Sequence, residues 1–290
     1  REKIFDNIWI QPAAGDAGGA LGAALSVWYL DNQRERKINS VSDAMKGSYL
    51  GPAFSDSEIE RELNACGAVF KKCSENELIE EVTSALVNEK VIGWMQGRME
   101  FGPRALGGRS IIADPRSHKM QKQLNLKVKY RESFRPFAPS VLCDDVGDWF
   151  EHYSDSPYML LVANVKKDKH RIMTDKEKSL FGIEKLNVPR SSVPAITHVD
   201  YSARIQTVHA NTNPLYYALI SNFKKVTNCP LIINTSFNVR GEPIVCTPTD
   251  AFKCFMGTDL DVLAVGSYVL VKEQQDQNLK KNYEKFYELD

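Results

Sequence analysis

Residues 98–140, RMEFGPRALGGRSIIADPRSHKMQKQLNLKVKYRESFRPFAPS, combine short apolar runs with a dense set of positive charges. The segment carries ten basic side chains: Arg98, Arg104, Arg109, Arg116, Lys119, Lys122, Lys127, Lys129, Arg131 and Arg135. Three acids lie among them, although the whole chain balances 37 Lys and Arg against 37 Asp and Glu. A guanidinium group matches phosphate or carboxylate oxygens two at a time. Several arginines on loops rich in glycine and proline therefore predict a site for a multiply charged anion.

Alternating helical and strand patterns surround this segment and indicate a mixed α/β (α+β) fold. Helices are predicted at 56–66, 75–89, 117–127, 213–227 and 247–256, the third of them exposed. Strands are predicted at 68–71, 91–96, 137–142, 158–165, 195–199, 202–208, 230–237 and 261–271. Residues 166–190 are polar and lack periodicity, which predicts a surface excursion.

A length of 290 residues makes about two domains the expectation. The loop 47–55, GSYLGPAFS, is the first candidate boundary. Before it, a short strand at 8–10 is expected to precede a helix that begins near Asp16 and is rich in Gly and Ala. The carboxylate of Asp16 suits either a helix cap or a metal ligand, and residue chemistry alone favours the cap.

Composition excludes several classes of protein. The values of 43% hydrophobic and 26% charged residues are ordinary for a soluble globular protein, and no apolar run approaches membrane-spanning length. Six scattered cysteines without a CxxC pair predict reduced thiols in a cytoplasmic protein. Zero net charge argues against a protein that coats nucleic acid or membranes. No signal peptide is visible, and a start at Arg1 leaves room for a missing N-terminal part.

The candidate anion-binding groups come from three separate places, each beside the end of an apolar strand, where ligands collect. They are Arg104 and Arg109, then Lys129, Arg131 and Arg135, and finally Arg204 with Arg240. Asn234, Ser236 and Asn238 add amide and hydroxyl groups of the kind that orient a nucleotide. For any one arginine a structural ion pair is the simpler interpretation, but the set together favours a ligand site. No P-loop and no recognisable nucleophile is present, so the expected chemistry is electrostatic.

Five motifs, in this order, resemble the C-terminal part of the O-carbamoyltransferases, a family that includes nodulation-factor and antibiotic carbamoyltransferases. They are QPAAGDAGGALGAA, EFGPRALGGRSIIADPR, KYRESFRPFAPS, DYSARIQTV and NTSFNVRGEPIVCTPTDA. The resemblance implies that residues 1–50 are the last piece of an actin/sugar-kinase-like domain. It further implies that residues 55–272 form a YrdC-like domain with a twisted mixed sheet and flanking helices, followed by a charged tail at 273–290.

The resemblance also implies a reaction. The YrdC-like domain would take carbamoyl phosphate and ATP and form carbamoyl-adenylate, and the kinase-like domain, with a metal, would pass the carbamoyl group to an acceptor hydroxyl. Lys129, Arg135, Arg204 and Arg240 match family positions that hold carbamoyl phosphate and the adenylate, and Asp16 matches an aspartate that ligates iron. The His-x-x-x-His pair of that metal site has no counterpart among the five histidines. We therefore expect weak metal binding, and only the first half-reaction, from this chain.

Two other functions remain open at this stage. An RNA-binding module with a YrdC-like fold would use the basic residues as a stripe with interleaved aromatics. A non-catalytic nucleotide-binding protein would bind ATP without turning it over. Tight Gly/Pro turns and zero net charge favour small-molecule partners, carbamoyl phosphate and a hydroxyl-bearing acceptor, over nucleic acid or membrane.

Overall fold

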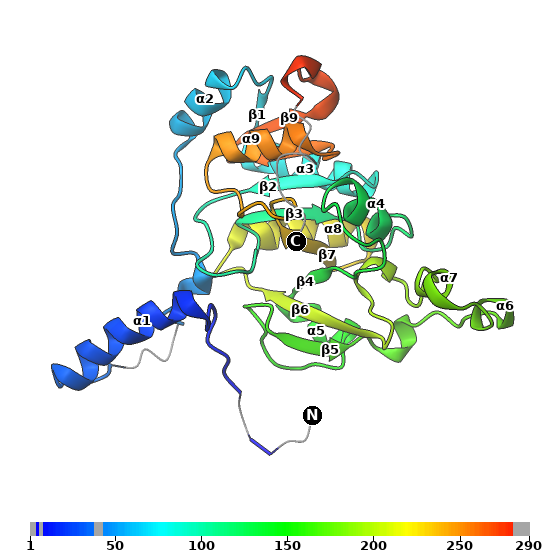
Figure 1. Cartoon of the computed structure of the whole chain (residues 1–290), viewed down its shortest axis with the longest axis horizontal. Helices are drawn as coiled ribbons and strands as arrows, with labels where there is room; N and C mark the ends of the chain where they lie inside the picture. Colours follow the sequence, from blue (N-terminus) through cyan, green and yellow to red (C-terminus); the bar gives the residue numbers. More distant parts are fainter. Residues whose placement is uncertain (1–3, 6–7, 38–42, 281–290) are drawn as a thin grey trace.

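The computed structural model describes residues 4–5, 8–37 and 43–280, and these residues form a nine-stranded mixed sheet with flanking helices (Figure 1). The mixed α/β fold class is thus confirmed, whereas the likeness to a YrdC domain stays a prediction. The strands are β1 (Lys71–Lys72), β2 (Ile92–Met95), β3 (Arg109–Ala113), β4 (Ala138–Leu142), β5 (Leu161–Asn164), β6 (Ser202–Val208), β7 (Leu231–Ser236), β8 (Val262–Val265) and β9 (Tyr268–Val271). The longer helices are α1 (Asp16–Ser26), α2 (Asp56–Ala65), α3 (Glu75–Val87), α4 (Met120–Lys127), α8 (Pro214–Thr227) and α9 (Pro248–Gly257).

Strands far apart in the chain lie side by side in this sheet. The order is β1-β9-β8-β2-β3-β7-β4-β6-β5. The strand β7 pairs antiparallel with both β3 and β4, while β4 pairs parallel with β6 and β2 pairs parallel with β8. The strands β2, β3, β4 and β8 are covered on both faces of the sheet. All their residues are therefore buried, and they show no alternation of buried and exposed side chains.

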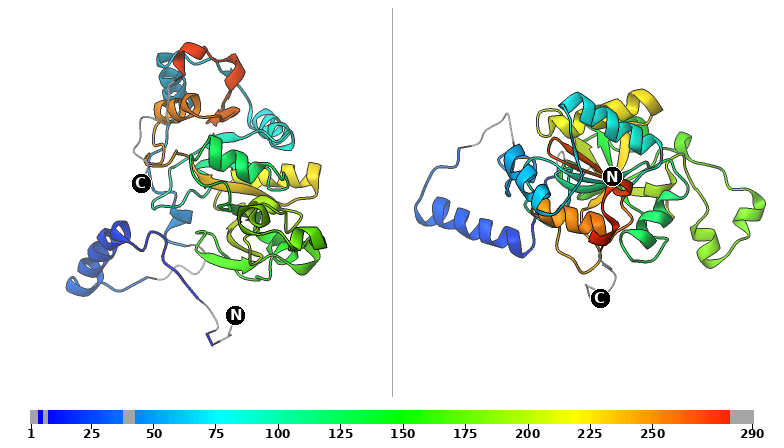
Figure 2. Two further views of the ribbon diagram at one scale, coloured as in Figure 1. Left: turned by 45° about the vertical axis from the view of Figure 1, so that its right-hand side comes forward. Right: turned by 90° about the horizontal axis from the view of Figure 1, so that it is seen from above.

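Helices cover both faces of the sheet. Figure 2 shows α3 and α8 on one face and α4 and α9 on the other. The helix α3 buries Leu78, Val82 and Leu86, which recur at helical spacing, and a reciprocal cap between Ser74 and Glu77 fixes its start.

Three predicted strands differ from the structure. Residues 8–10 form no strand, and the strand expected at 68–71 is the short β1 at Lys71–Lys72. Residues 195–199 form no strand either: a 3-10 turn spans Pro194–Ile196, because Pro194 lacks the N–H that a strand ladder needs and suits a first helical position.

Three further differences concern boundaries. The run 261–271 is two strands, because Gly266 at φ +52° turns the chain between β8 and β9. The sequence does not predict β3, because the charge of Arg109 makes residues 109–113 resemble part of the preceding basic loop. The helix expected at 117–127 begins at Met120 and is partly buried, since Met120, Leu124 and Asn125 face the core.

The N-terminal region extends from this body (Figure 1). The helix α1 has no buried residue, and Leu21 is the part of it that packs against a small apolar cluster around Met45 and Leu106. Residues 48–52 instead pair with the loop after β2. The Met99 N–H donates to Pro52 O at 2.9 Å, and the Phe101 N–H donates to Ser48 O at 2.6 Å.

The excursion at 166–190 lies on the surface, as predicted, and contains the short helices α6 (Asp175–Lys178) and α7 (Gly182–Leu186) (Figure 1). The tail forms two 3-10 turns, Lys272–Gln274 and Gln277–Leu279, and the rest of the predicted tail, 281–290, lies outside the described residues. Among the described helices, none is both long and apolar enough to cross a membrane.

Candidate functional site

The three predicted sources of anion-binding groups lie on four segments of the fold, and these segments meet at one end of the sheet. The pairs Ala138↔Asn234 and Ser110↔Ser236 place the starts of β4 and β3 beside the end of β7. Because β6 runs parallel to β4, its start lies at the same end. The loop before β3, the segment before β4, the first residues of β6 and the loop after β7 therefore converge there. These segments carry Arg104, Arg135, Arg204 and Arg240 respectively.

Lys129 lies at the centre of this convergence and is buried. Its Nζ donates to Ser236 O at 2.6 Å, Asn238 O at 2.9 Å and Asn238 Oδ1 at 2.9 Å, and it lies 3.2 Å from Ser236 Oγ. Burial lowers the pKa of Lys129 to about 7, whereas the surrounding oxygens favour the ammonium form. These bonds engage all the donors of the ammonium group, so Lys129 holds the loop after β7 in place.

Three arginines surround this lysine at the surface. Arg135 forms an ion pair with Glu132 at 2.9 Å. A backbone hydrogen bond, and then the charges of Arg135, Arg240 and Arg131, lower the pKa of Glu132 below its usual range. Arg131 donates to Asn125 Oδ1 at 2.6 Å and lies over the Phe137 ring. We call Lys129, Arg131, Arg135 and Arg240 the basic cluster. One exposed carboxylate faces three guanidinium groups, which leaves a net positive surface.

Arg104 and Arg204 form a second group. Partial burial, and then the nearby charge of Arg104, lower the pKa of Arg204. The Nη2 atom of Arg204 lies 3.9 Å from Met159 Sδ, and neither arginine forms an ion pair with any residue that the structure describes. Two guanidinium groups close together without a carboxylate make a place for an anion.

Arg104 also lines a cavity of about 370 Å³, which we call the loop cavity. Its walls include residues 10–17, the loop 101–104, Ser48 and Tyr158. Ser48 Oγ, Arg104 Nε and Tyr158 Oη are buried and have no hydrogen-bond partner within the described part of the chain. Buried polar atoms without partners are costly, so the residues that carry them make the loop cavity a candidate place for a polar ligand.

The basic cluster and the Arg104–Arg204 pair lie at the same end of the sheet. Ser140 of β4 pairs with Gln206 of the parallel strand β6, so Ala138, two residues earlier, lies beside Arg204. Ala138 also pairs with Asn234 of β7. Arg204, Ala138 and Asn234 therefore form one row across three strands. Two strand spacings separate the Arg204 and Asn234 backbones, which is about 10 Å. Asn234 in turn lies two residues before Ser236, a partner of Lys129.

Arg109 and Asn234 support the site from beneath. Arg109 is fully buried, and its Nη atoms donate to the carbonyls of Gln96, Gly97, Gly108 and Pro52. Asn234 Nδ2 donates to Ala105 O at 3.0 Å and to Gln206 Oε1 at 2.8 Å, while Gln206 Nε2 donates to Leu106 O. These bonds fix the loop that carries Arg104. The sequence predicts an anion at Arg109 and a nucleotide at Asn234, and the structure places the polar groups of both residues inside the protein instead.

Ser236 and Asn238, predicted to orient the nucleotide, are half-buried partners of Lys129. The Ser236 hydroxyl donates to Asn238 Oδ1 at 2.7 Å, and Asn238 Nδ2 donates to Glu242 O at 2.6 Å. Together they shape the turn that presents Arg240.

Asp16, the predicted metal ligand, is the exposed first residue of α1 and borders the loop cavity. In the described ranges, no three His, Cys, Asp or Glu side chains lie together as a metal site requires. A single carboxylate supplies too few donors for iron or another divalent cation. The residues present therefore do not form this metal site by themselves, and the metal remains a prediction.

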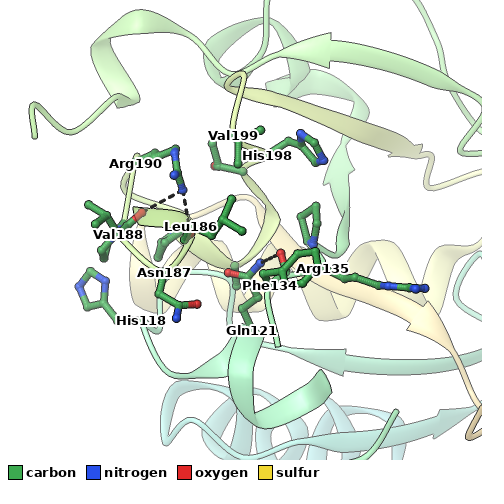
Figure 3. Close-up of a pocket in the computed structure, with 15 residues that line it drawn as sticks. His118, Gln121, Phe134, Arg135, Leu186, Asn187, Val188, Arg190, His198 and Val199 are labelled. Atoms are coloured by element: carbon green, nitrogen blue, oxygen red, sulfur yellow. Dashed lines mark hydrogen bonds between the residues drawn. The ribbon is translucent and has the colours of Figure 1, made fainter. Parts of the chain in front are cut away.

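A second cavity, of about 310 Å³, opens beside Arg135 (Figure 3). Its walls come from the start of α4, residues 134–136, and residues 186–199. Sequence reasoning did not anticipate this cavity, nor the roles of Ser48 and Tyr158. Isolated serine and tyrosine residues in unpatterned segments carry no signal until the fold brings them together.

Comparison with known proteins defines the class to which this arrangement belongs. A family model described as the carbamoyltransferase C-terminus matches residues 83–272, more than half of the chain. The chain therefore belongs to the carbamoyltransferase family.

Individual relatives agree with this assignment. The chain is 58% identical over 293 residues to an uncharacterized protein of Synechocystis, covering 100% of the chain and 48% of that protein. It is 41% identical over 273 residues to nodulation protein NolO of Bradyrhizobium diazoefficiens, covering 93% of the chain and 45% of that protein. It is also 41% identical to nodulation protein NolNO of Sinorhizobium fredii, covering 94% and 37% respectively. The chain thus spans about half the length of these relatives, or less.

Proposed function

We propose that this chain binds carbamoyl phosphate and ATP and forms a carbamoyl-adenylate. The observation that carries the proposal is the convergence of two groups of guanidinium side chains at one end of the sheet. Two polyanionic substrates repel each other, and cations fixed in advance offset that repulsion without reorganising. Arg204 lies on β6, and the other arginines lie on loops that buried hydrogen bonds hold, which is the arrangement this chemistry needs.

The reaction has two steps. Water first cleaves carbamoyl phosphate into carbamate and inorganic phosphate, which leaves. A carbamate oxygen then attacks the α-phosphorus of ATP, and the bond to the departing pyrophosphate breaks. The step needs positive charge beside both the attacked phosphate and the departing one. We assign Arg131, Arg135 and Arg240 to the phosphates of ATP, and Arg104 and Arg204 to the carbamoyl phosphate end. The hydroxyls of Ser48 and Tyr158 then supply hydrogen bonds to carbamoyl phosphate in the loop cavity. Lys129 acts as a positioning residue for Arg240.

Carbamoyl transfer to a hydroxyl-bearing acceptor is our proposal for the whole protein. It would need a divalent metal to polarise the acceptor, and Asp16 would contribute one ligand. Membership of the carbamoyltransferase family supports a small-molecule acceptor.

The test is exchange of labelled pyrophosphate into ATP, measured with and without carbamoyl phosphate. We expect exchange that depends on carbamoyl phosphate and that falls at least tenfold in Arg204→Ala and Arg240→Ala. Arg61→Ala, which removes an exposed guanidinium from α2, serves as the matched control and should retain wild-type exchange. Equal exchange in all four proteins would refute the assignment. ATP binding without any exchange would instead favour a nucleotide-binding protein that is not an enzyme.

A further inference from the structure

Glu100 is a buried carboxylate to which the proposed function gives no part, and 6% of its surface is exposed. Its Oε1 atom accepts the backbone N–H groups of Leu106 at 2.6 Å, Gly108 at 2.7 Å and Arg109 at 3.3 Å. Backbone N–H groups that converge in this way form a nest for an anion. In this chain the nest holds an internal carboxylate, so Glu100 fixes the loop whose N–H groups it binds.

The bonds of Glu100 close the chain around Arg104. Glu100 precedes Arg104 in the sequence, and its three partners follow Arg104. The later arm of the loop is also anchored to the body, because Leu106 O accepts from Tyr49 Oη at 2.7 Å and from Gln206 Nε2 at 2.8 Å. The carboxylate therefore ties the early arm of the loop to an anchored later arm, with Arg104 between them.

The early arm of the loop also contacts the segment that carries Ser48. The N–H of Phe101, the residue after Glu100, donates to Ser48 O at 2.6 Å. Ser48 and Arg104 both line the loop cavity. The fit between the two arms is close, since a Cβ added at Gly108 would lie 3.1 Å from either carboxylate oxygen of Glu100. The relative position of Ser48 and Arg104 thus depends on the Glu100 carboxylate.

The charge of Glu100 is a separate contribution. Burial lowers the pKa of Arg109, and the nearby charge of Glu100 opposes that decrease. The carboxylate therefore stabilises a buried guanidinium as well as the loop. Two substitutions separate these contributions. Glu100→Gln keeps an acceptor oxygen at the same reach without the charge, whereas Glu100→Asp keeps the charge on a side chain that is one methylene shorter.

We propose that Glu100 is a positioning residue for carbamoyl phosphate, and that its hydrogen bonds to the loop hold Arg104 where this ligand binds. This inference rests on the proposed function, because that function places carbamoyl phosphate at Arg104 and Arg204. It adds a residue that contacts neither substrate and that affects the binding of one of them. The basic cluster is anchored instead by Lys129 and the loop after β7, so ATP binding does not depend on Glu100.

Calorimetric titration with carbamoyl phosphate and, separately, with ATP tests this role. We expect Glu100→Asp to weaken carbamoyl phosphate at least tenfold, because the shorter side chain cannot reach all the N–H groups, and to leave ATP within twofold of wild type. Glu100→Gln should bind both ligands within about threefold of wild type, since the acceptor oxygen remains. It should nevertheless lower the urea midpoint, because Arg109 is then buried without the nearby negative charge. A purely structural role would instead make the loss of affinity follow the loss of stability.

Asp114→Ala is the matched control for a general loss of stability. Asp114 is another buried carboxylate, with 2% of its surface exposed, and it accepts from the Arg116 guanidinium at 2.6 Å. It follows the last residue of β3 and therefore lies at the far end of that strand from the loop that carries Arg104. This variant should lower the urea midpoint and leave both affinities within twofold of wild type.

Equal losses of carbamoyl phosphate binding in Glu100→Asp and Glu100→Gln, or equal losses of carbamoyl phosphate and ATP in Glu100→Asp, would overturn the positioning role. A loss of carbamoyl phosphate binding in Asp114→Ala as large as in Glu100→Asp would overturn it as well. Any of these results alongside pyrophosphate exchange in the wild type leaves the proposed function intact. The expected affinities alongside a wild type that shows no pyrophosphate exchange would support the role of Glu100 and reject the adenylation reaction.

Discussion

Two arginines in this chain, Arg109 and Arg240, show how the same side chain serves opposite purposes. Both lie in glycine-containing segments, and the sequence predicts an anion for each. Arg109 is fully buried and donates to four backbone carbonyls. Arg240 is half-buried and forms no hydrogen bond to any described residue, although it feels the charge of Glu132. The two arginines differ in how deeply the fold buries them, and the local sequence around each residue does not determine that burial.

The first prediction follows from that difference. Arg109→Met leaves several buried carbonyls without donors, so it should lower the free energy of unfolding by roughly 3 kcal/mol or more. Arg240→Met removes no internal bond and should change stability by less than about 0.5 kcal/mol. Urea unfolding of the two variants and wild type measures both values. Equal losses would mean that Arg240 is as structural as Arg109.

The second prediction concerns Lys129 and pH. Burial lowers its pKa from 10.5 to about 7 in the folded protein. Between these values the unfolded chain binds more protons at this residue, so its contribution to stability rises with pH in that window. The stability difference between wild type and Lys129→Met should therefore shift toward wild type by about 2 kcal/mol from pH 7 to pH 9. A difference that stays constant would show that the surrounding oxygens keep the ammonium charged.

At the level of elements, sequence reasoning succeeded where local signals and burial agree. Capping boxes at Ser55–Glu58, Ser74–Glu77 and Thr247–Asp250 mark the starts of α2, α3 and α9 close to the predicted positions. It failed at β3, because a strand that opens with a buried arginine resembles a charged loop. The convergence of basic segments could be predicted, since strand ends gather at the ends of a sheet. Their grouping into two clusters depends on strand order, which a single sequence does not reveal.

The third prediction tests the loop between β2 and β3. Gly107 has φ +104°, and an added Cβ would lie 2.4 Å from the Tyr216 ring on α8. Gly97 also has positive φ, +55°, but nothing lies within 4 Å of an added Cβ. Gly97→Ala should cost about 1 kcal/mol of stability, from backbone strain alone. Gly107→Ala should cost roughly 3 kcal/mol, from strain and collision, and should also weaken carbamoyl phosphate binding by displacing Arg104. Thermal unfolding and titration distinguish the two variants.

For the whole molecule, the fourth prediction concerns where the folded unit begins. Residues 48–52 bond to Met99 and Phe101, and Pro52 O accepts from Arg109. A chain that starts at residue 44 keeps these contacts, whereas one that starts at residue 55 loses them. Both should unfold cooperatively, with the shorter chain at a distinctly lower urea midpoint because buried donors lose their partners. Identical midpoints would mean that residues 44–54 are dispensable for folding.

The place of β7 in the sheet has a consequence for how the chain is made. The strand β7 (residues 231–236) lies between β3 and β4, which are synthesised about a hundred residues earlier. The strand β1 likewise cannot pair until β9 has been synthesised. Until the last quarter of the chain leaves the ribosome, β3 and β4 each present a row of unpaired backbone groups and apolar side chains. Pairings of such long sequence separation form slowly, because loop closure precedes any gain from contacts. Early termination before residue 231 would therefore yield an aggregating product rather than a smaller folded one.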